Sequence, residues 1–203
     1  MRIGLLGGSF DPVHTGHVAL ARAAHAELAL DRVLFLPTAH PPHKPDRRMV
    51  SALARYTMVE LALLAEPGLY ASPIEWTPGS PVYTIDTVER LRADYPHARL
   101  FLLLGADSFA ALPAWRRWEE LVGLIDIAVA ARPGWSLPEL TAGAAPPLQA
   151  AIAAGRVHLL AAPPLRWSST ELRATFARGE EPPAGAPPPA AVDDIPNDRP
   201  SGR

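Results

Sequence analysis

The 203-residue chain contains no cysteine, no excess of basic residues and no apolar run of membrane-spanning length. The lack of cysteine excludes disulfides, thiolate catalysis and cysteine-ligated zinc, and it fits a reducing compartment. A formal net charge of −2 gives no electrostatic reason to expect nucleic acid or an anionic membrane as a partner, since both favour a basic surface. The N-terminal residues run directly into a predicted strand and lack the features of a signal peptide. We therefore expect a cytoplasmic protein.

Short runs rich in Leu, Val, Ile and Phe alternate with helical patterns along most of the chain. This alternation predicts an α/β fold: a Rossmann-like doubly wound sheet of about six mainly parallel strands, with helices on both faces and ligands at the carboxyl ends of the strands. The strands are expected at 2–7, 32–37, 69–75, 99–105, 125–131 and 156–161. The helices are expected at 16–29, 51–65, 85–94, 115–124, part of 137–154, and 169–178.

The composition changes sharply after residue 180, where prolines and acidic residues replace most apolar side chains. Too few apolar groups remain there to offset the entropy cost of ordering the chain. We therefore expect one domain over 1–180, long enough to bury a sizeable core. A proline-rich, acidic tail follows over 181–203, and about its last fifteen residues are expected to be mobile.

The most informative motif joins the first predicted strand to the first predicted helix and reads Gly7-Gly8-Ser9-Phe10-Asp11-Pro12-Val13-His14-Thr15-Gly16-His17. Small residues at a strand end let main-chain N–H groups approach an anion, and the following helix N-terminus adds partial positive charge. His14 and His17 share one face of a helix that starts near Thr15. A plain turn with two surface histidines would explain the glycines but not the paired imidazoles. The HTGH segment resembles the HxGH signature of a nucleotidyltransferase superfamily.

A second candidate anion site lies near the end of the predicted domain, in Ser168-Ser169-Thr170-Glu171-Leu172-Arg173. Ser168 and Glu171 have the spacing of a capping box, which predicts a helix start with outward-pointing N–H groups. A capping box alone is usually only a local structural feature. The superfamily, however, carries a signature of the form SSTxxR near its C-terminus. The resemblance implies a triphosphate site in which Arg173 neutralises the departing pyrophosphate.

The polar loop over 37–48 contains four prolines and five side chains that can carry positive charge, His43 and Lys44 among them. Such a loop can close over an anionic ligand, although a solvated connection explains it equally well. His14, His40 and His43 lack an accompanying carboxylate and a regular ligand spacing. We therefore expect no metal bound by the protein itself.

Two further stretches, 79–87 and 105–118, together resemble one family of this superfamily, nicotinate-nucleotide adenylyltransferase. The resemblance covers roughly residues 1 to 180. In physical terms, Thr84 is expected to cap a helix whose first-turn amides receive a carboxylate, and Trp115 offers a flat face to a pyridine ring. Asp107 directly follows a strand and is placed to accept ribose hydroxyls. Trp118 is expected to belong to the core.

The resemblance implies transfer of the adenylyl group of ATP to nicotinate mononucleotide, giving nicotinate adenine dinucleotide (deamido-NAD) and pyrophosphate in NAD biosynthesis. The transfer is expected to be direct and in line, without a covalent intermediate, and Mg²⁺ is expected to be carried by the phosphates. The implied catalytic residues are His14, His17, Lys44 and Arg173. The implied ATP-binding residues are Gly7, Gly8, Ser9, Phe10, Gly105, Asp107, Ser168, Ser169 and Thr170. The implied nicotinate-nucleotide-binding residues are Tyr83, Thr84, Trp115, His43 and Arg132.

Two departures from the family pattern stand out: Val82 occupies a position where the family usually has Ser or Thr, and Pro196 interrupts a short closing helix. Three alternatives stay open at this point. A nicotinamide-specific or a pantetheine-phosphate adenylyltransferase would share the first loop, and a dinucleotide sensor would retain the fold without catalysis. The sequence leaves the oligomeric state, monomer or homo-oligomer, undetermined.

Overall fold

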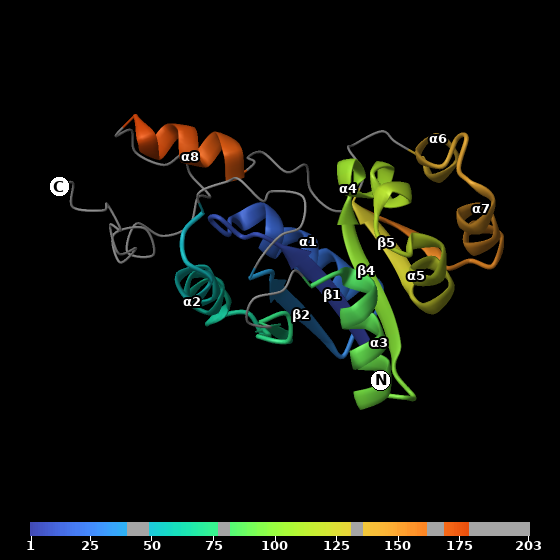
Figure 1. The fold of residues 1–203 in the computed structure, drawn as a ribbon, viewed down its shortest axis with the longest axis horizontal. Coiled ribbons are helices and arrows are strands. Elements are labelled where there is room, and N and C mark those ends of the chain that lie inside the picture. Colours follow the sequence, from blue (N-terminus) through green and yellow to red (C-terminus); the bar gives the residue numbers. More distant parts are fainter. Residues whose placement is uncertain (40–48, 77–81, 131–135, 162–168, 179–203) are drawn as a thin grey trace.

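A computed structural model describes residues 1–39, 49–76, 82–130, 136–161 and 169–178 (Figure 1). Within these residues the strands form one sheet in the order β3-β2-β1-β4-β5-β6, and every strand pair is parallel. The strands are β1 (Arg2–Gly8), β2 (Arg32–Pro37), β3 (Leu69–Ala71), β4 (Arg99–Gly105), β5 (Asp126–Ala130) and β6 (Val157–Leu160). The predicted doubly wound α/β fold is confirmed.

The helices follow the strands in the alternating order that the sequence predicts. They are α1 (Thr15–Glu27), α2 (Ala52–Leu63), α3 (Thr84–Asp94), α4 (Ala106–Ala110), the 3₁₀ helix η1 (Leu112–Ala114), α5 (Trp118–Leu124), α6 (Leu137–Leu140), α7 (Pro146–Ala153) and α8 (Ser169–Ala177). None of the helices in the described ranges is long and apolar enough to cross a membrane.

Three predicted elements have wrong boundaries for reasons visible in the backbone. The third strand ends at Ala71 rather than at residue 75, because Ser72 makes a last hydrogen bond to Phe35 and Pro73 has no N–H to continue the ladder. The helix expected over 137–154 is two helices, because Gly143 has a positive φ of 73° and α7 restarts with a proline in its first turn.

The third wrong boundary lies beside the candidate site. The helix expected over 115–124 begins only at Trp118, and α4 and η1 precede it. Arg117 adopts a left-handed conformation (φ 51°) that ends the preceding turn. Its guanidinium contacts Glu120 on α5 and Glu89 on α3, so two ion pairs accompany this conformation.

Side chains alternate between the two faces of the sheet and build two separate cores. Phe101 and Leu103 of β4 pack with α1 and α2, whereas Leu100, Leu102 and Leu104 pack with α3, α5 and α7. Each fully buried side chain of this kind contributes about 1.5–3 kcal/mol. This two-sided burial fixes the sheet as a rigid base for the loops at its carboxyl edge.

The central strand β1 lies between β2 and β4, so the loops after these three strands are neighbours. Thr38, just after β2, donates its main-chain N–H to the carbonyl oxygen of Gly8 at 3.0 Å. From β1 the chain adds β2 and β3 on one side of the sheet, and from β4 it adds β5 and β6 on the other side. Ligands of doubly wound sheets bind at such a switch point.

Candidate active site

The HTGH segment forms the N-terminus of α1, with His14 as the N-cap residue and Thr15 as the first helical residue. The predicted helix start is therefore confirmed. The two imidazole rings stack with centroids 3.7 Å apart, and the main-chain N–H of His14 donates to Nδ1 of His17 at 3.2 Å. Because Nδ1 accepts this hydrogen bond, the neutral His17 ring carries its proton on Nε2.

Both histidines are held in the neutral form by burial. Burial lowers the pKa of His14 from 6.5 to about 4, and burial followed by the proximity of His14 lowers the pKa of His17 well below its usual value. His14 Nδ1 is a buried nitrogen for which the described residues provide no hydrogen-bond partner. The pair can therefore offer N–H donors to an incoming anion, and an anion would favour their protonation.

The loop after β1 is shaped by one aromatic ring. Phe10 has a positive φ of 47°, and its buried ring contacts His17 edge-on at 5.0 Å between centroids and Phe35 at 5.6 Å. A Cβ at Gly8 would lie 3.2 Å from this ring, so glycine allows the close packing. A Cβ at Gly7 would meet no atom within 4 Å among the described residues. The main chain at Gly7 therefore borders open space.

Helix α8 brings the second predicted motif onto this loop. Ser169 Oγ donates to the carbonyl oxygen of Pro12 at 3.0 Å, and the guanidinium of Arg173 donates to the carbonyl oxygen of Asp11. The structure thus places a hydroxyl and a cation from α8 beside the His14 and His17 loop. Ser168 and the side chain of Thr170 lie outside the described residues.

The carboxyl end of β4 provides the third part of the site. Asp107 is exposed in the first turn of α4, directly after the strand. A Cβ at Gly105 would meet no described atom within 4 Å, as at Gly7 on the neighbouring strand. Both glycines therefore border open space at the switch point, where a nucleotide could approach the main chain closely.

The residues expected to hold the pyridine nucleotide lie near α3. Thr84 is the first helical residue and Tyr83 the N-cap, so the expectation that Thr84 caps the helix is wrong. Tyr83 and Trp115 are partly buried against the same core as α3. The Arg116 guanidinium carbon lies 4.6 Å from the centroid of the Tyr83 ring. Trp118 packs against this core as expected.

The structure also reveals three charged residues that the sequence analysis did not single out: Arg55, Glu75 and Arg116. Arg55 and Glu75 are buried, with 1% and 4% of their surfaces exposed. No local motif marks them, and charged residues are ordinarily read as surface positions. Arg116 could have been noticed only as a cation adjacent to Trp115.

His43, Lys44 and Arg132 lie outside the described residues, as does the C-terminal tail. The described residues contain no group of three or more His, Cys, Asp or Glu side chains suited to a metal ion.

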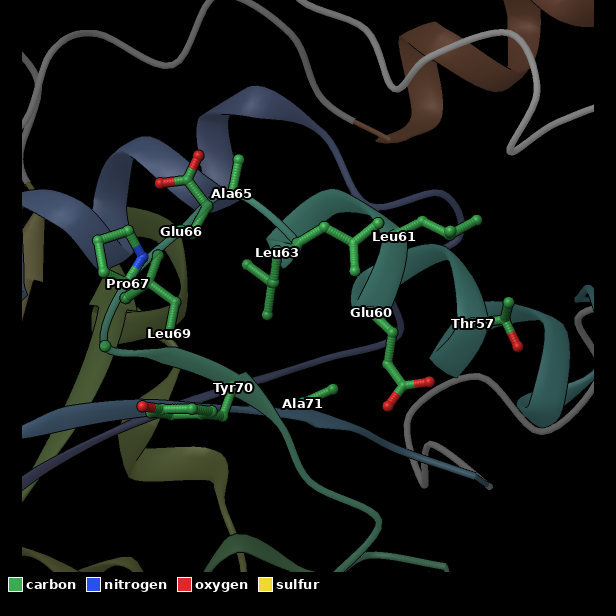
Figure 2. Close-up of a pocket in the computed structure, with 12 residues that line it drawn as sticks. Thr57, Glu60, Leu61, Leu63, Ala65, Glu66, Pro67, Leu69, Tyr70 and Ala71 are labelled. Atoms are coloured by element: carbon green, nitrogen blue, oxygen red, sulfur yellow. The ribbon is translucent and has the colours of Figure 1, made fainter.

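A hollow of about 780 Å³ lies between α2 and β3, away from these loops (Figure 2). Glu60, Leu61, Leu63 and Tyr70 are among its lining residues, and it contains none of the predicted site residues. We therefore place the candidate site at the carboxyl edge of the sheet and not in this hollow.

Comparison with known proteins finds similar sequences. Residues 5–175 match the cytidylyltransferase-like family model. A probable nicotinate-nucleotide adenylyltransferase of Bordetella petrii is 48% identical over 181 residues, which covers 88% of each chain. A protein of the same description from Neisseria meningitidis serogroup B is 42% identical over 190 residues, covering 94% of each chain.

Solved structures share the fold at low sequence identity. The nicotinic acid mononucleotide adenylyltransferase of Plasmodium falciparum, complexed with NaAD, superimposes with a TM-score of 0.72 at 17% identity and covers 89% of this chain and 86% of its own. The same enzyme complexed with APC superimposes with a TM-score of 0.70.

Proposed function

The chain belongs to the nicotinate-nucleotide adenylyltransferase family, and we propose that the loops at the carboxyl edge of its sheet transfer the adenylyl group of ATP directly to nicotinate mononucleotide. The products are nicotinate adenine dinucleotide and pyrophosphate, so the enzyme is a nucleotidyltransferase of NAD biosynthesis.

The contact of α8 with the loop after β1 is the observation that carries this assignment. It joins Ser169 and Arg173 to the carbonyl oxygens of Pro12 and Asp11, next to the stacked imidazoles. A charged donor, two imidazoles and a helix N-terminus together suit the phosphates of ATP. A dinucleotide sensor would have no need for such a concentration of donors around a leaving group.

The proposed reaction is one in-line displacement at the α-phosphorus. A phosphate oxygen of nicotinate mononucleotide forms the new bond to phosphorus, and the bond to the oxygen bridging the α- and β-phosphates breaks, so that pyrophosphate leaves with the electron pair. The acceptor phosphate is already anionic near neutral pH, and the protein therefore needs to align and stabilise rather than to activate a nucleophile. The Nε2–H of His17 is proposed to donate to the α-phosphate.

The other site residues are proposed to bind either the phosphates, the rest of ATP or the acceptor. His14, Lys44 and Arg173 are assigned to the phosphates. The loop after β1, together with Ser168, Ser169, Thr170, Gly105 and Asp107, is assigned to ATP. Tyr83, Thr84, Trp115, His43 and Arg132 are assigned to the acceptor. His14 and His17 act here as neutral donors, because burial lowers their pKa values.

Acid recognition is proposed to rest on α3 and Arg116. The N-terminus of α3 offers main-chain N–H groups to the carboxylate of nicotinate. The second helix start, predicted near Trp115, lies at Trp118 on a short helix. Its N-terminus is therefore not proposed to bind the carboxylate of nicotinate. Arg116, stacked on Tyr83, supplies a positive charge in its place.

Mg²⁺ is proposed to accompany ATP on its phosphate oxygens, where it would neutralise charge. The described groups assigned to the phosphates are imidazoles, hydroxyls and a guanidinium, which suit phosphate oxygens better than Mg²⁺, an ion that prefers carboxylate, phosphate and water oxygens. A cytoplasmic location is proposed on the absence of cysteine from the sequence.

The deciding experiment compares acceptors side by side. Purified protein, ATP and Mg²⁺ are incubated with nicotinate mononucleotide, nicotinamide mononucleotide or phosphopantetheine, and pyrophosphate release is measured. Release that requires nicotinate mononucleotide supports the proposal. No release with any acceptor would point to a sensor, and preference for phosphopantetheine or the amide would assign the chain to a different transferase.

A further inference from the structure

A partly buried hydrogen-bond network connects the loop after β1 to helix α3. Thr38, the residue after β2, lies at its centre and uses all three of its polar groups. Its N–H donates to the Gly8 carbonyl oxygen at 3.0 Å, its carbonyl oxygen accepts from Arg55 at 2.8 Å, and its hydroxyl donates to Glu75 at 2.7 Å. Thr38 is therefore a shared partner of the first loop, of α2 and of the segment after β3.

Arg55 fixes the first loop from the α2 side. Its Nη1 also donates to the carbonyl oxygen of Ser9 at 2.6 Å, while Nη2 and Nε donate to those of Ala39 and Val50 at 3.2 and 3.0 Å. Burial lowers the pKa of Arg55, and the nearby Asp11 carboxylate opposes this change. One planar guanidinium thus sets the positions of four carbonyl oxygens, a task to which the compact ammonium of lysine is not suited.

Glu75 extends the network to α3. Its Oε2 accepts from Thr38, and its Oε1 accepts from the hydroxyl of Thr87 at 3.1 Å. Thr87 lies in α3 one turn after Thr84, the residue proposed to meet the acceptor. Both oxygens of this buried carboxylate therefore point at side chains of the protein. Burying a carboxylate is costly unless its hydrogen bonds perform a specific task.

We propose that Arg55, Thr38 and Glu75 are positioning residues that hold the ATP loop and the start of α3 at the separation needed for in-line transfer. This inference rests on the proposed function of the two sites. The network is a continuous path of described hydrogen bonds from Ser9, in the loop proposed to bind ATP, to Thr87, in the helix proposed to meet the acceptor. Misplacement by about 1 Å can reduce turnover by on the order of 10²-fold.

The test compares paired substitutions at the two side-chain links. Glu75→Leu and Thr38→Val remove hydrogen bonds, whereas Glu75→Gln and Thr38→Ser retain them, because a threonine hydroxyl can either donate or accept. We expect the first pair to lose about tenfold or more in kcat at saturating substrates, and the second pair to stay within about threefold of wild type. Thr57→Val removes an exposed α2 hydroxyl that bonds to Leu53 and serves as the matched control.

Positioning and simple stability are separated by three measurements on the same proteins: kcat, the Kd of ATP and of nicotinate mononucleotide measured singly, and the melting temperature. The proposal requires a fall in kcat with each single Kd within about threefold and the protein folded at the assay temperature. It is overturned if Glu75→Leu and Thr38→Val retain wild-type kcat, if their losses match the unfolded fraction, or if Glu75→Gln is as impaired as Glu75→Leu. Wild-type activity in the acceptor assay tests the proposed function independently.

Discussion

Arg173 of α8 donates a hydrogen bond to the main-chain carbonyl oxygen of Asp11, 162 positions earlier in the chain. Together with the hydrogen bond from Ser169 to Pro12, this contact holds the last described helix against the first loop. A phosphate would have to compete with, or share, the Asp11 carbonyl oxygen.

The first prediction concerns this arginine. Arg173→Ala removes a charged donor proposed to stabilise the leaving pyrophosphate, and one such donor is worth on the order of 10²–10³ in kcat. We expect a loss of that size in steady-state turnover with nicotinate mononucleotide. Arg178→Ala, on the exposed end of the same helix region, is the control and should remain near wild type. Equal activities of the two variants would remove Arg173 from the mechanism.

His17 allows a substitution that separates its two nitrogens. His17→Asn can keep an acceptor for the His14 N–H but loses the Nε2 donor. We expect kcat to fall by on the order of 10²–10³ while the Kd of ATP and the melting temperature change little. The variant is followed by turnover assays and by thermal denaturation. Retention of a third or more of wild-type kcat would contradict the assigned role of Nε2.

The lowered histidine pKa values predict acid sensitivity. His14 titrates near 6.5 when unfolded and near 4 when folded, so the unfolded chain binds more protons between these values. The stabilisation is complete above pH 6.5, and the free energy of unfolding falls as the pH drops toward 4, by at most about 1.4 kcal/mol per pH unit for each histidine. His17 acts with the same sign.

Urea denaturation at several pH values between 4 and 7 checks this dependence. His14→Gln should weaken the pH dependence of the free energy of unfolding by the equivalent of up to one bound proton. Glu75 contributes with the opposite sign, since burial raises its pKa: its stabilisation is present below pH 4.5 and is lost as the pH rises through the folded value. An unchanged slope in His14→Gln would show that the stability loss comes from other groups.

Selectivity for the acid over the amide is the fourth prediction. A carboxylate at the N-terminus of α3 gains up to ~2 kcal/mol over a neutral group, equivalent to roughly thirtyfold. We expect kcat/KM for nicotinate mononucleotide to exceed that for nicotinamide mononucleotide by at least tenfold. Trp115→Ala should weaken both, because ring stacking does not depend on the substituent. Equal efficiencies would contradict recognition of the carboxylate by α3.

Arg116 and Arg117 provide a matched pair for this selectivity. Arg116 stacks on Tyr83, whereas Arg117 is engaged by Glu89 and Glu120. Arg116→Gln should lower the acid-to-amide ratio by about fivefold, equivalent to about 1 kcal/mol. Arg117→Gln should leave the ratio unchanged. The reverse pattern would move the acid-recognising charge to Arg117.

The tail gives the fifth prediction. It contains no motif, and its composition lacks the apolar side chains of a core. Deleting residues 196–203 should leave the melting temperature and kcat/KM nearly unchanged. Aggregation or loss of activity on truncation would make the tail structural, and the domain would then extend past residue 180.

Periodicity predicted the sheet well because a buried parallel strand and its crossover helix leave strong, separate apolar patterns. It failed where single residues decide the backbone. Pro73 ends β3 early, and the left-handed Arg117 delays α5 until Trp118. Because α5 starts at Trp118 and not near Trp115, its N-terminus is not proposed to recognise the carboxylate of nicotinate.

The sequence singles out candidate site residues where they lie in a contiguous motif, as His14 and Arg173 do. The sequence analysis did not identify Arg55 and Glu75, because their roles depend on partners that are distant in the chain or outside their own element. These partners are Ser9 and Val50 for the arginine and Thr87 for the glutamate. The neutral state of the histidines likewise depends on burial, which a linear motif does not reveal.

Strand polarity in the parallel sheet also decides where the enzyme can be tethered. Met1 lies at the edge from which β1 and β4 start, with its carbonyl oxygen bonded to the Arg99 N–H (Figure 1). The seven residues of β1 then span about 23 Å before the His14 loop. A fusion partner or solid support attached at the N-terminus would therefore leave substrate entry unobstructed, whereas one joined shortly after α8 would begin a few residues from Arg173.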